Sequence, residues 1–248
     1  MSLAAAYMFG RKQGLVIPLA DFLAGYKFEN NYNDSAKTNN GTGTGTTFST
    51  VQKIAGTYSA LFNSANPDYV NFPYSADFDF SAVTNSKPFS ISMWVYFTAD
   101  QDSWLISARD VSNEGEFQLN YVSGTFQFTV FDQQRRIDTG SFSFIQSTLT
   151  PATSVVGRWI NLAGVFDGVT DCILYVDNVA GSAAVNTNSF AKIKNYTQTI
   201  KLGVTPWDIV TFRSFKGYMD ETYIYNKELT TNEITYVYDK GIAGQSLI

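Results

Sequence analysis

The chain has 248 residues, of which 44% are apolar, 16% aromatic and 16% charged, and its formal net charge is −5. This composition excludes a disordered polymer, and the length suits one all-β domain or one domain with an extension. The sequence contains no histidine and one cysteine, Cys172, which excludes His-based catalysis, His metal ligands and an internal disulfide. An acidic balance speaks against nucleic-acid binding, and no apolar run approaches the roughly 20 residues of a membrane span.

Residues 1–22 are rich in apolar side chains and show no alternating strand pattern. They lack a basic segment ahead of the apolar stretch, and Arg11 and Lys12 interrupt it, so we do not interpret them as a secretory signal. Two interpretations stay open: a tail that covers the domain's own surface, and an anchor to a neighbouring subunit. We therefore divide the chain into an N-terminal extension or anchor, residues 1–22, and one domain, residues 23–248.

Alternation of apolar and polar residues predicts strands along most of the remaining chain. Residues 25–30 predict a first strand, and the Asn-, Gly- and Thr-rich residues 31–47 predict a loop. Residues 57–63 and 68–72 lie on either side of Asn66-Pro67 and predict a hairpin. Further strands are predicted at residues 89–97, 103–109, 117–122, 125–131, 136–144, 199–204 and 215–226, with a loop at 147–156.

Residues 157–178, GRWINLAGVFDGVTDCILYVDN, predict another hairpin, because Asp167-Gly168 lies between two apolar-rich runs. Residues 230–241 predict one helix, with Thr230 and Glu233 as a capping box and Gly241 as the C-terminal stop. About a dozen short strands and one late helix predict two packed antiparallel sheets, a sandwich or jelly roll. A parallel α/β fold would need helices between the strands.

Four segments, taken in chain order, resemble the laminin-G-like branch of the concanavalin A-like lectin/glucanase superfamily. They are residues 26–42, residues 56–73 together with 89–97, the hairpin 157–178, and the closing strand and helix within 202–238. The resemblance covers residues 24–241, and Asn178 stands where the family usually has glycine, in a turn that asparagine also tolerates. It implies an all-β, two-sheet antiparallel jelly-roll sandwich with one short C-terminal helix.

The resemblance also implies one structural calcium ion, held between the early loop and an aspartate of the closing strand. The matching aspartate is Asp220, and Asp34 of the early loop could add a second hard oxygen ligand. The alternative is that Asp220 only caps a neighbouring loop through hydrogen bonds.

Sugar-binding modules of this superfamily present aromatic and amide side chains from loops or from a concave sheet face. The candidates for such a role here are Trp207, Trp104 and Tyr121. Trp207 stands out because the sequence TPWD around it is typical of a loop. The alternative for an isolated tryptophan is a lid over the core.

Glycosidases of the same superfamily carry paired carboxylates on one strand. Glu114 and Glu116 have the i, i+2 spacing that places two side chains on one strand face. The third acid of the family's arrangement is missing after them, so we expect no catalytic residues and no enzyme activity.

Three functions remain for comparison, since one fold hosts all of them. We expect a non-catalytic structural or adhesion protein, a component of a virus (phage) particle that displays a glycan- or protein-binding surface. Its partners would be a glycan or cell-surface protein and, through residues 1–22, other virion subunits or copies of itself, with no nucleic acid and no membrane. The alternatives are a free carbohydrate-binding lectin module and, third, a glycoside hydrolase. The expected location is the virion surface or the cell exterior without a conventional signal peptide, with the cytoplasm as the alternative.

Overall fold

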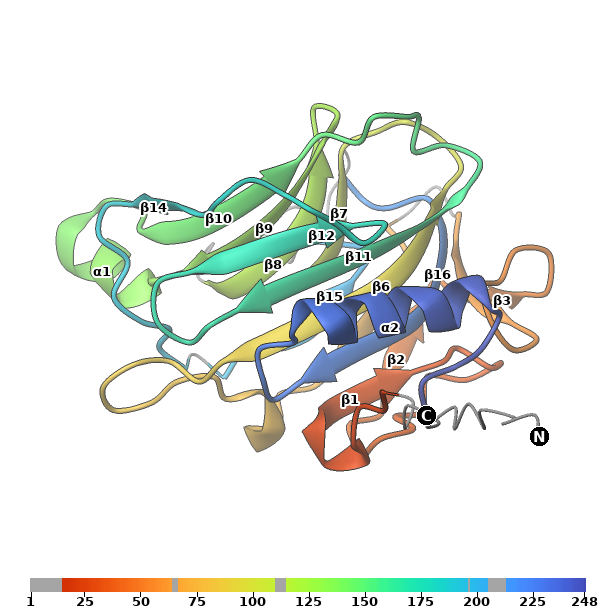
Figure 1. Cartoon of the computed structure of the whole chain (residues 1–248), viewed down its shortest axis with the longest axis horizontal. Coiled ribbons are helices and arrows are strands. Elements are labelled where there is room, and N and C mark those ends of the chain that lie inside the picture. The colour runs from red at the N-terminus through yellow and green to blue at the C-terminus, as the bar shows by residue number, and fades with distance from the viewer. Residues whose placement is uncertain (1–14, 64–66, 110–114, 196, 205–212) are drawn as a thin grey trace, which may run out of the picture.

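Two antiparallel sheets pack face to face in the computed structural model, which describes residues 15–63, 67–109, 115–195, 197–204 and 213–248 (Figure 1). Sheet A has the order β13 (Val179–Ala180), β12 (Cys172–Val176), β11 (Trp159–Phe166), β6 (Phe89–Phe97), β16 (Gly217–Tyr225), β4 (Ser59–Phe62), β3 (Thr47–Ser49), and β1 (Phe22–Tyr26) pairs with β16. Sheet B has the order β14 (Val185–Thr187), β10 (Phe144–Leu149), β9 (Thr125–Phe131), β8 (Gly115–Val122), β7 (Ser103–Arg109), β15 (Ile200–Leu202), β5 (Tyr69–Phe72), β2 (Thr42–Thr44). The predicted two-sheet antiparallel jelly-roll sandwich is confirmed.

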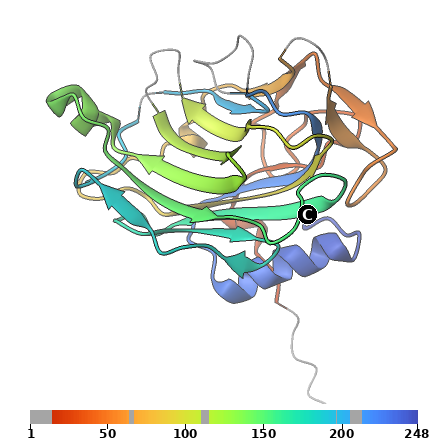
Figure 2. The ribbon, with the colours of Figure 1, turned by 90° about the horizontal axis from the view of Figure 1, so that it is seen from above.

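The helical elements lie outside the two sheets. Helix α2 (Thr231–Ile242) crosses the outer face of sheet A, as Figure 2 shows from a second direction. The shorter α1 (Gln133–Thr139) connects β9 to β10, and two 3-10 turns, η1 (Leu19–Asp21) and η2 (Ala76–Phe78), complete the elements. None of the helices in the described ranges is both long and apolar enough to cross a membrane.

The space between the sheets is filled by aromatic rings. Phe89 lies at its centre, with ring centroids 4.2 Å from Phe80, 5.3 Å from Phe117 and 5.5 Å from Phe166. Burial of each such ring stabilises the fold by roughly 1.5–3 kcal/mol before conformational entropy is subtracted. The high aromatic content of the sequence is therefore used mainly in the core.

A second apolar cluster joins α2 to the outer face of sheet A. Ile234 and Val237 of the helix are buried there together with Tyr223 of β16. Ile17 and Phe22 are buried in the same cluster. The chain thus packs onto the domain from Ile17 onward, whereas residues 1–14 of the predicted extension lie outside the described residues.

Helix α2 begins as the sequence predicts and ends later. The Thr230 hydroxyl accepts the backbone N–H of Glu233, and the Glu233 carboxylate accepts the backbone N–H of Thr230, which confirms the capping box. Gly241 is not the C-terminal stop: it lies within the helix, and Gly244, with φ of +70°, follows the end instead. Gly241 is needed for another reason, since it faces the indole of Trp94.

Several strand predictions are confirmed, whereas one hairpin, one strand and two loops differ from the prediction. Residues 57–63 and 68–72 form no hairpin, because β4 belongs to sheet A and β5 to sheet B. The strand predicted at 136–144 is replaced by α1 and by β10, which occupies part of the loop predicted at 147–156. The short strands β2 and β3 occupy the predicted loop 31–47 and its C-terminal boundary. The hairpin within 157–178 forms as predicted from β11 and β12.

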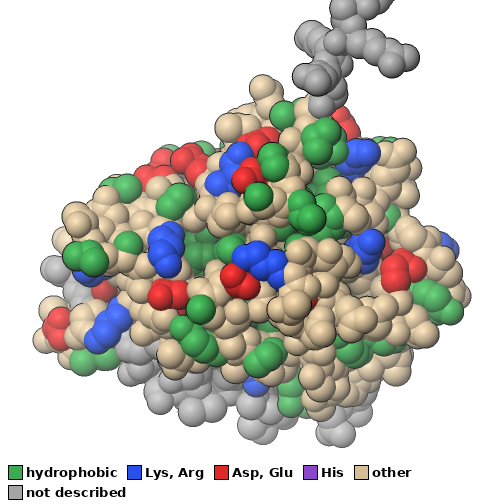
Figure 3. All heavy atoms as spheres, turned by 90° about the horizontal axis from the view of Figure 1, so that it is seen from below, with side chains coloured by type: hydrophobic (Ala, Val, Ile, Leu, Met, Phe, Trp, Pro, Cys, Tyr) green, Lys and Arg blue, Asp and Glu red, His purple; other side chains and the backbone are tan. Residues whose placement is uncertain are grey.

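Acidic and basic side chains are interspersed on the molecular face drawn in Figure 3. Neither sign gathers there into a stripe among the coloured, described side chains. That part of the surface lacks the continuous basic footprint by which proteins bind nucleic-acid backbones.

Candidate ligand site on the outer face of sheet B

The outer face of sheet B carries a row of polar side chains that crosses six strands. Its members stand opposite one another in successive strands, in the order Asn71, Lys201, Ser107, Gln118, Thr129, Gln146. The row follows from strand alternation, since Phe117 and Leu119 of β8 point into the core and Gln118 between them points outward. Amide and hydroxyl groups of this kind both donate and accept hydrogen bonds.

A pocket of about 270 Å³ lies where this row reaches β8, β9 and β10. Its lining consists of Arg109, Gln118, Thr129, Phe131, Phe142, Phe144 and Gln146. Phe131 and Phe144 stand opposite each other in β9 and β10, with ring centroids 6.2 Å apart at 61°. The volume is slightly below the usual range for ligand pockets, which starts at about 300 Å³, so the pocket suits a small group such as one sugar ring. We call this feature the sheet B pocket.

The polar groups of the sheet B pocket are held in place by one another. The Arg109 guanidinium lies 4.7 Å above the centroid of the Phe131 ring, and its Nη1 donates to Gln118 Oε1 at 2.6 Å. Gln146 Nε2 donates to Thr129 Oγ1 at 2.8 Å. The pocket therefore combines oriented amides and a cation with apolar rings. Such a pocket suits a ligand with hydroxyl groups on its edge and C–H groups on its face.

A larger hollow of about 540 Å³ lies between α1 and residues 191–195. Asp132 Oδ2 accepts the backbone N–H of Ala191 there at 2.9 Å, and Lys194 Nζ donates to Gln134 Oε1. Its polar groups thus hold two connecting segments together, and none of its lining residues is aromatic. We favour the smaller sheet B pocket because, of these two hollows, it is the one whose described lining combines aromatic rings with oriented amides.

Two of the three predicted ligand residues are described, and neither offers its ring to a ligand. Trp104 lies on the outer face of β7 but is 3% exposed, and the Arg213 guanidinium covers its ring at 5.0 Å. Tyr121 points into the core, where its ring packs 4.8 Å from Phe126, so the prediction of a ligand platform at Tyr121 is corrected. Trp207 lies outside the described residues.

The Tyr121 hydroxyl reaches the edge of the core and donates to Asp100 Oδ1 at 3.0 Å. Burial, followed by this hydrogen bond and the charge of Asp100, raises the pKa of Tyr121 to about 12. The side chain is therefore a neutral structural donor at physiological pH.

Asp220, the first predicted calcium ligand, is fully buried in β16. Its Oδ2 accepts the backbone N–H of Ile54 at 3.0 Å, and its Oδ1 accepts that of Glu221 at 2.9 Å. Burial, with the neighbouring charge of Glu221 as a second cause, raises the pKa of Asp220 to about 8. The carboxyl group holds the loop around Ile54 against sheet A. This is the loop-capping role that the sequence offered as the alternative to calcium binding.

Asp34, the second predicted calcium ligand, plays a similar part in the early loop. Its Oδ1 accepts the backbone N–H groups of Gly25 and Ala36, both at 2.9 Å, and its Oδ2 accepts that of Asn39 at 3.0 Å. These bonds close the loop over the end of β1.

These surroundings do not fit a calcium cage. Calcium takes six to eight oxygen ligands, whereas backbone N–H groups point at the carboxylates of Asp220 and Asp34. Among the described residues, no group of three or more Asp, Glu or Cys side chains lies close enough together to hold a metal ion. Calcium at Asp220 is an expectation of the family resemblance, and the hydrogen bonds to its carboxyl group argue against it.

The residues of the sheet B pocket are absent from the sequence-based candidates. A signal for two of them exists, because alternation in residues 117–122 and 125–131 places Gln118 and Thr129 opposite the core-facing side chains. Gln118 and Thr129 are neighbours only because of the register in which β8 and β9 pair, and alternation along a strand does not reveal that register.

Residues 64–235 match the laminin-G family model described as the concanavalin A-like lectin/glucanases superfamily. The chain belongs to this family, as its sequence resemblance indicates. No curated protein sequence matches the chain.

Solved structures of two kinds are similar to this chain. Domain 4 of AbnA, an extracellular GH43 arabinanase from Geobacillus stearothermophilus solved with arabinotriose, has a TM-score of 0.61 and 19% identity, covering 88% of this chain and 98% of that chain. The botulinum neurotoxin serotype D binding domain has a TM-score of 0.64 and 14% identity, covering 89% and 52%. The serotype D ligand binding domain in complex with N-acetylneuraminic acid has a TM-score of 0.63 and 12% identity, covering 89% and 51%. This chain therefore spans about half of the toxin domains, and such identities show the fold alone.

Proposed function

We propose that this chain is a non-catalytic glycan-binding module that holds a sugar ring in the sheet B pocket. One observation carries the proposal: the row of polar side chains on the outer face of sheet B lies beside the rings of Phe131 and Phe144. A sugar has an apolar C–H face and a hydroxyl edge. The half-buried Phe144 would contact the face and the half-buried Gln146 would bind the hydroxyls, with the buried Phe131 and Gln118 supporting them from beneath.

The comparisons support a carbohydrate as the ligand class. The arabinanase domain was solved with arabinotriose, and one toxin domain was solved with N-acetylneuraminic acid. Those ligands belong to those proteins, and the sugar bound here is a matter for experiment.

The lining of the sheet B pocket supports binding without catalysis. Glycoside hydrolysis generally needs two carboxyl groups on either side of the scissile bond, about 5 Å apart or somewhat more. The seven described residues that line the pocket include no carboxylate. The expected display of this module on a virus particle stays a prediction, and the described residues supply no argument for it.

The test is binding to a glycan array on which arabinotriose and N-acetylneuraminic acid are the first two probes. We expect the native chain to bind at least one glycan, and Phe144→Ala and Gln146→Ala to weaken that binding at least tenfold. Thr148→Ala is the matched control, because Thr148 lies on the same face of β10 but does not line the pocket. An array without any bound glycan, or equal binding by all variants, would overturn the proposal.

A further inference from the structure

A second row of side chains, on the outer face of sheet A, consists of aromatic residues. Trp159, Tyr96 and Tyr218 stand opposite one another in β11, β6 and β16. Tyr96 lies edge-to-face against both neighbours, with centroid distances of 5.7 Å to Trp159 and 5.7 Å to Tyr218. All three side chains are half-buried, so each keeps part of its surface in contact with water. We call this feature the sheet A aromatic row.

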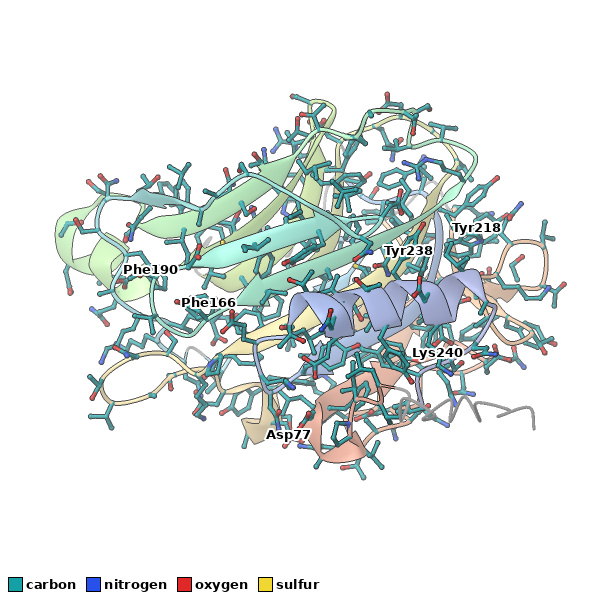
Figure 4. All side chains as sticks on the ribbon, in the orientation of Figure 1. Asp77, Phe166, Phe190, Tyr218, Tyr238 and Lys240 are labelled. Carbon is teal, nitrogen blue, oxygen red and sulfur yellow. The ribbon has the colours of Figure 1, made fainter. Side chains whose placement is uncertain are left out.

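Helix α2 covers the neighbouring part of sheet A and leaves this row open. Trp94 lies one step along β6 on the same face, and the Tyr238 ring of α2 stacks on it at 5.7 Å. In Figure 4, Tyr218 lies past the helix on the side of its C-terminal end, and the Tyr238 side chain of the helix lies on the side that faces Tyr218. The helix thus forms one wall beside the row.

A fixed ion pair lies at the Trp159 end of the row. Arg158 Nη1 lies 2.5 Å from Asp177 Oδ2, and Asp177 Oδ1 accepts the backbone N–H of Asn161 at 2.9 Å. The two charged side chains are 34% and 24% exposed, so water or a ligand can reach both. Together with two tyrosine hydroxyls, they place hydrogen-bonding groups around the rings.

We propose that the sheet A aromatic row is a second carbohydrate site, in which rings of a linear polysaccharide stack on Trp159 and Tyr218, with Tyr96 edge-on between them. Rows of half-exposed Trp and Tyr offer apolar faces and polar tips at once, which matches the two kinds of surface on a pyranose ring. Strands in a sheet are about 4.8 Å apart, so Trp159 and Tyr218 lie about 10 Å apart across two strand spacings. That span is comparable to two linked sugar rings.

Other occupants fit this surface less well. Nucleic acid would need unpaired cationic charge, and the Arg158 guanidinium beside the row is neutralised by Asp177. A stable protein partner buries about 800 Å² on each side, whereas three half-buried aromatic side chains expose only a few hundred Å² at about 150–250 Å² each. The rings are also held by edge-to-face contacts before any ligand arrives, which lowers the entropy cost of stacking.

This site and the sheet B pocket are on opposite outer faces of the sandwich, and neither depends on the other. The test is affinity electrophoresis of the full chain in gels that contain hydroxyethylcellulose, xylan, glucomannan or linear arabinan. We expect at least one polysaccharide to retard the native chain. Trp159→Ala and Tyr218→Ala should each lower the affinity at least tenfold, whereas Thr148→Ala, which lies outside both sites, should leave retardation in that gel unchanged.

Tyr218→Phe and Tyr74→Ala complete the design. Tyr218→Phe keeps the ring and should retain most of the affinity, and Tyr74→Ala removes an aromatic side chain that is 40% exposed elsewhere. If Trp159→Ala is unstable, Tyr218→Ala carries the test, with folding checked by near-UV circular dichroism. Absence of retardation in every gel, or equal retardation of the row variants and the native chain, would overturn the second site. A loss of retardation in Phe144→Ala alone would assign polysaccharide binding to the sheet B pocket instead.

Discussion

Gly241, in the last turn of α2, lies against the indole ring of Trp94. A Cβ added at Gly241 would come within 2.4 Å of Trp94 Nε1, Cε2 and Cζ2. Trp94 cannot move away easily, because it is 2% exposed and stacks on Tyr238. The helix and the sheet therefore approach each other at a distance that only glycine permits.

We expect Gly241→Ala to destabilise the domain although alanine is the better helix former. The gain in helix propensity is about 1 kcal/mol, whereas overpacking a rigid contact costs about 1–3 kcal/mol. The net loss should appear as a Tm a few degrees lower in thermal unfolding. Asp239→Ala, at an exposed position of the same helix, is the control and should stay within about 0.5 kcal/mol of the native chain. An equal or higher Tm for Gly241→Ala would show that the helix can shift off the sheet.

The Glu233 carboxylate should make stability depend on pH. Burial acts to raise the pKa of Glu233, but hydrogen bonds from Lys227 Nζ at 2.7 Å and from Thr230 outweigh it and hold the pKa below its ordinary value. A depressed folded-state pKa contributes stability above the unfolded-state pKa of about 4.3, and this stability is lost as pH falls through the folded-state pKa.

The comparison is between the native chain and Glu233→Gln in urea unfolding from pH 3 to pH 7. We expect the native chain to be more stable at pH 7 and the difference to shrink as the solution is acidified below about pH 4.3. Lys227→Met should also be less stable than the native chain at pH 7, since it removes the cation that pairs with both Glu233 and Asp21. A difference that stays constant over the whole range would assign the effect to the shape of the cap rather than to its charge.

Calcium binding can be tested at Asp220. If Asp220 ligates calcium, added calcium should raise the Tm of the native chain and a chelator should lower it, while Asp220→Asn should respond to neither. The geometry favours the opposite result, because the carboxyl group already accepts N–H groups from Ile54 and Glu221. We therefore expect equal, negligible calcium responses in both proteins. A calcium-dependent Tm in the native chain alone would restore Asp220 to a metal site.

Much of the fold could be predicted because its signals are local. The strand 89–97 and the hairpin around Asp167-Gly168 follow from alternation and from one turn sequence. The capping box follows from Thr230 and Glu233 three residues apart. Assignment of a strand to a sheet is not local: β4 and β5 look like a hairpin around Asn66-Pro67, yet they lie in opposite sheets.

The candidate site was harder to predict because it depends on register. Gln118, Thr129 and Gln146 are neighbours only because β8, β9 and β10 pair at one particular offset. Tyr121 could have been assigned correctly, since it shares the period-two positions of Phe117 and Leu119 and so points to the core.

Two truncations of the N-terminal segment can distinguish a role in the stability of the domain from a role in assembly. Ile17 and Phe22 are 4% and 0% exposed in the cluster beneath α2, so a truncation that removes residues 1–22 takes two side chains out of a packed core. We expect it to lower the free energy of unfolding by at least about 5 kcal/mol, since deleting one large buried side chain usually costs about 2–5 kcal/mol and two are removed. A truncation of residues 1–14 leaves both in place.

Light scattering on the same three proteins tests the predicted anchor. If residues 1–14 join this chain to other copies or to a particle, the native chain should form an oligomer that the truncation of residues 1–14 abolishes without a change in Tm. The same mass for the native chain and for this truncation would remove self-association as the role of the segment and favour the free glycan-binding module. A truncation of residues 1–22 as stable as the native chain would contradict the core position of Ile17 and Phe22.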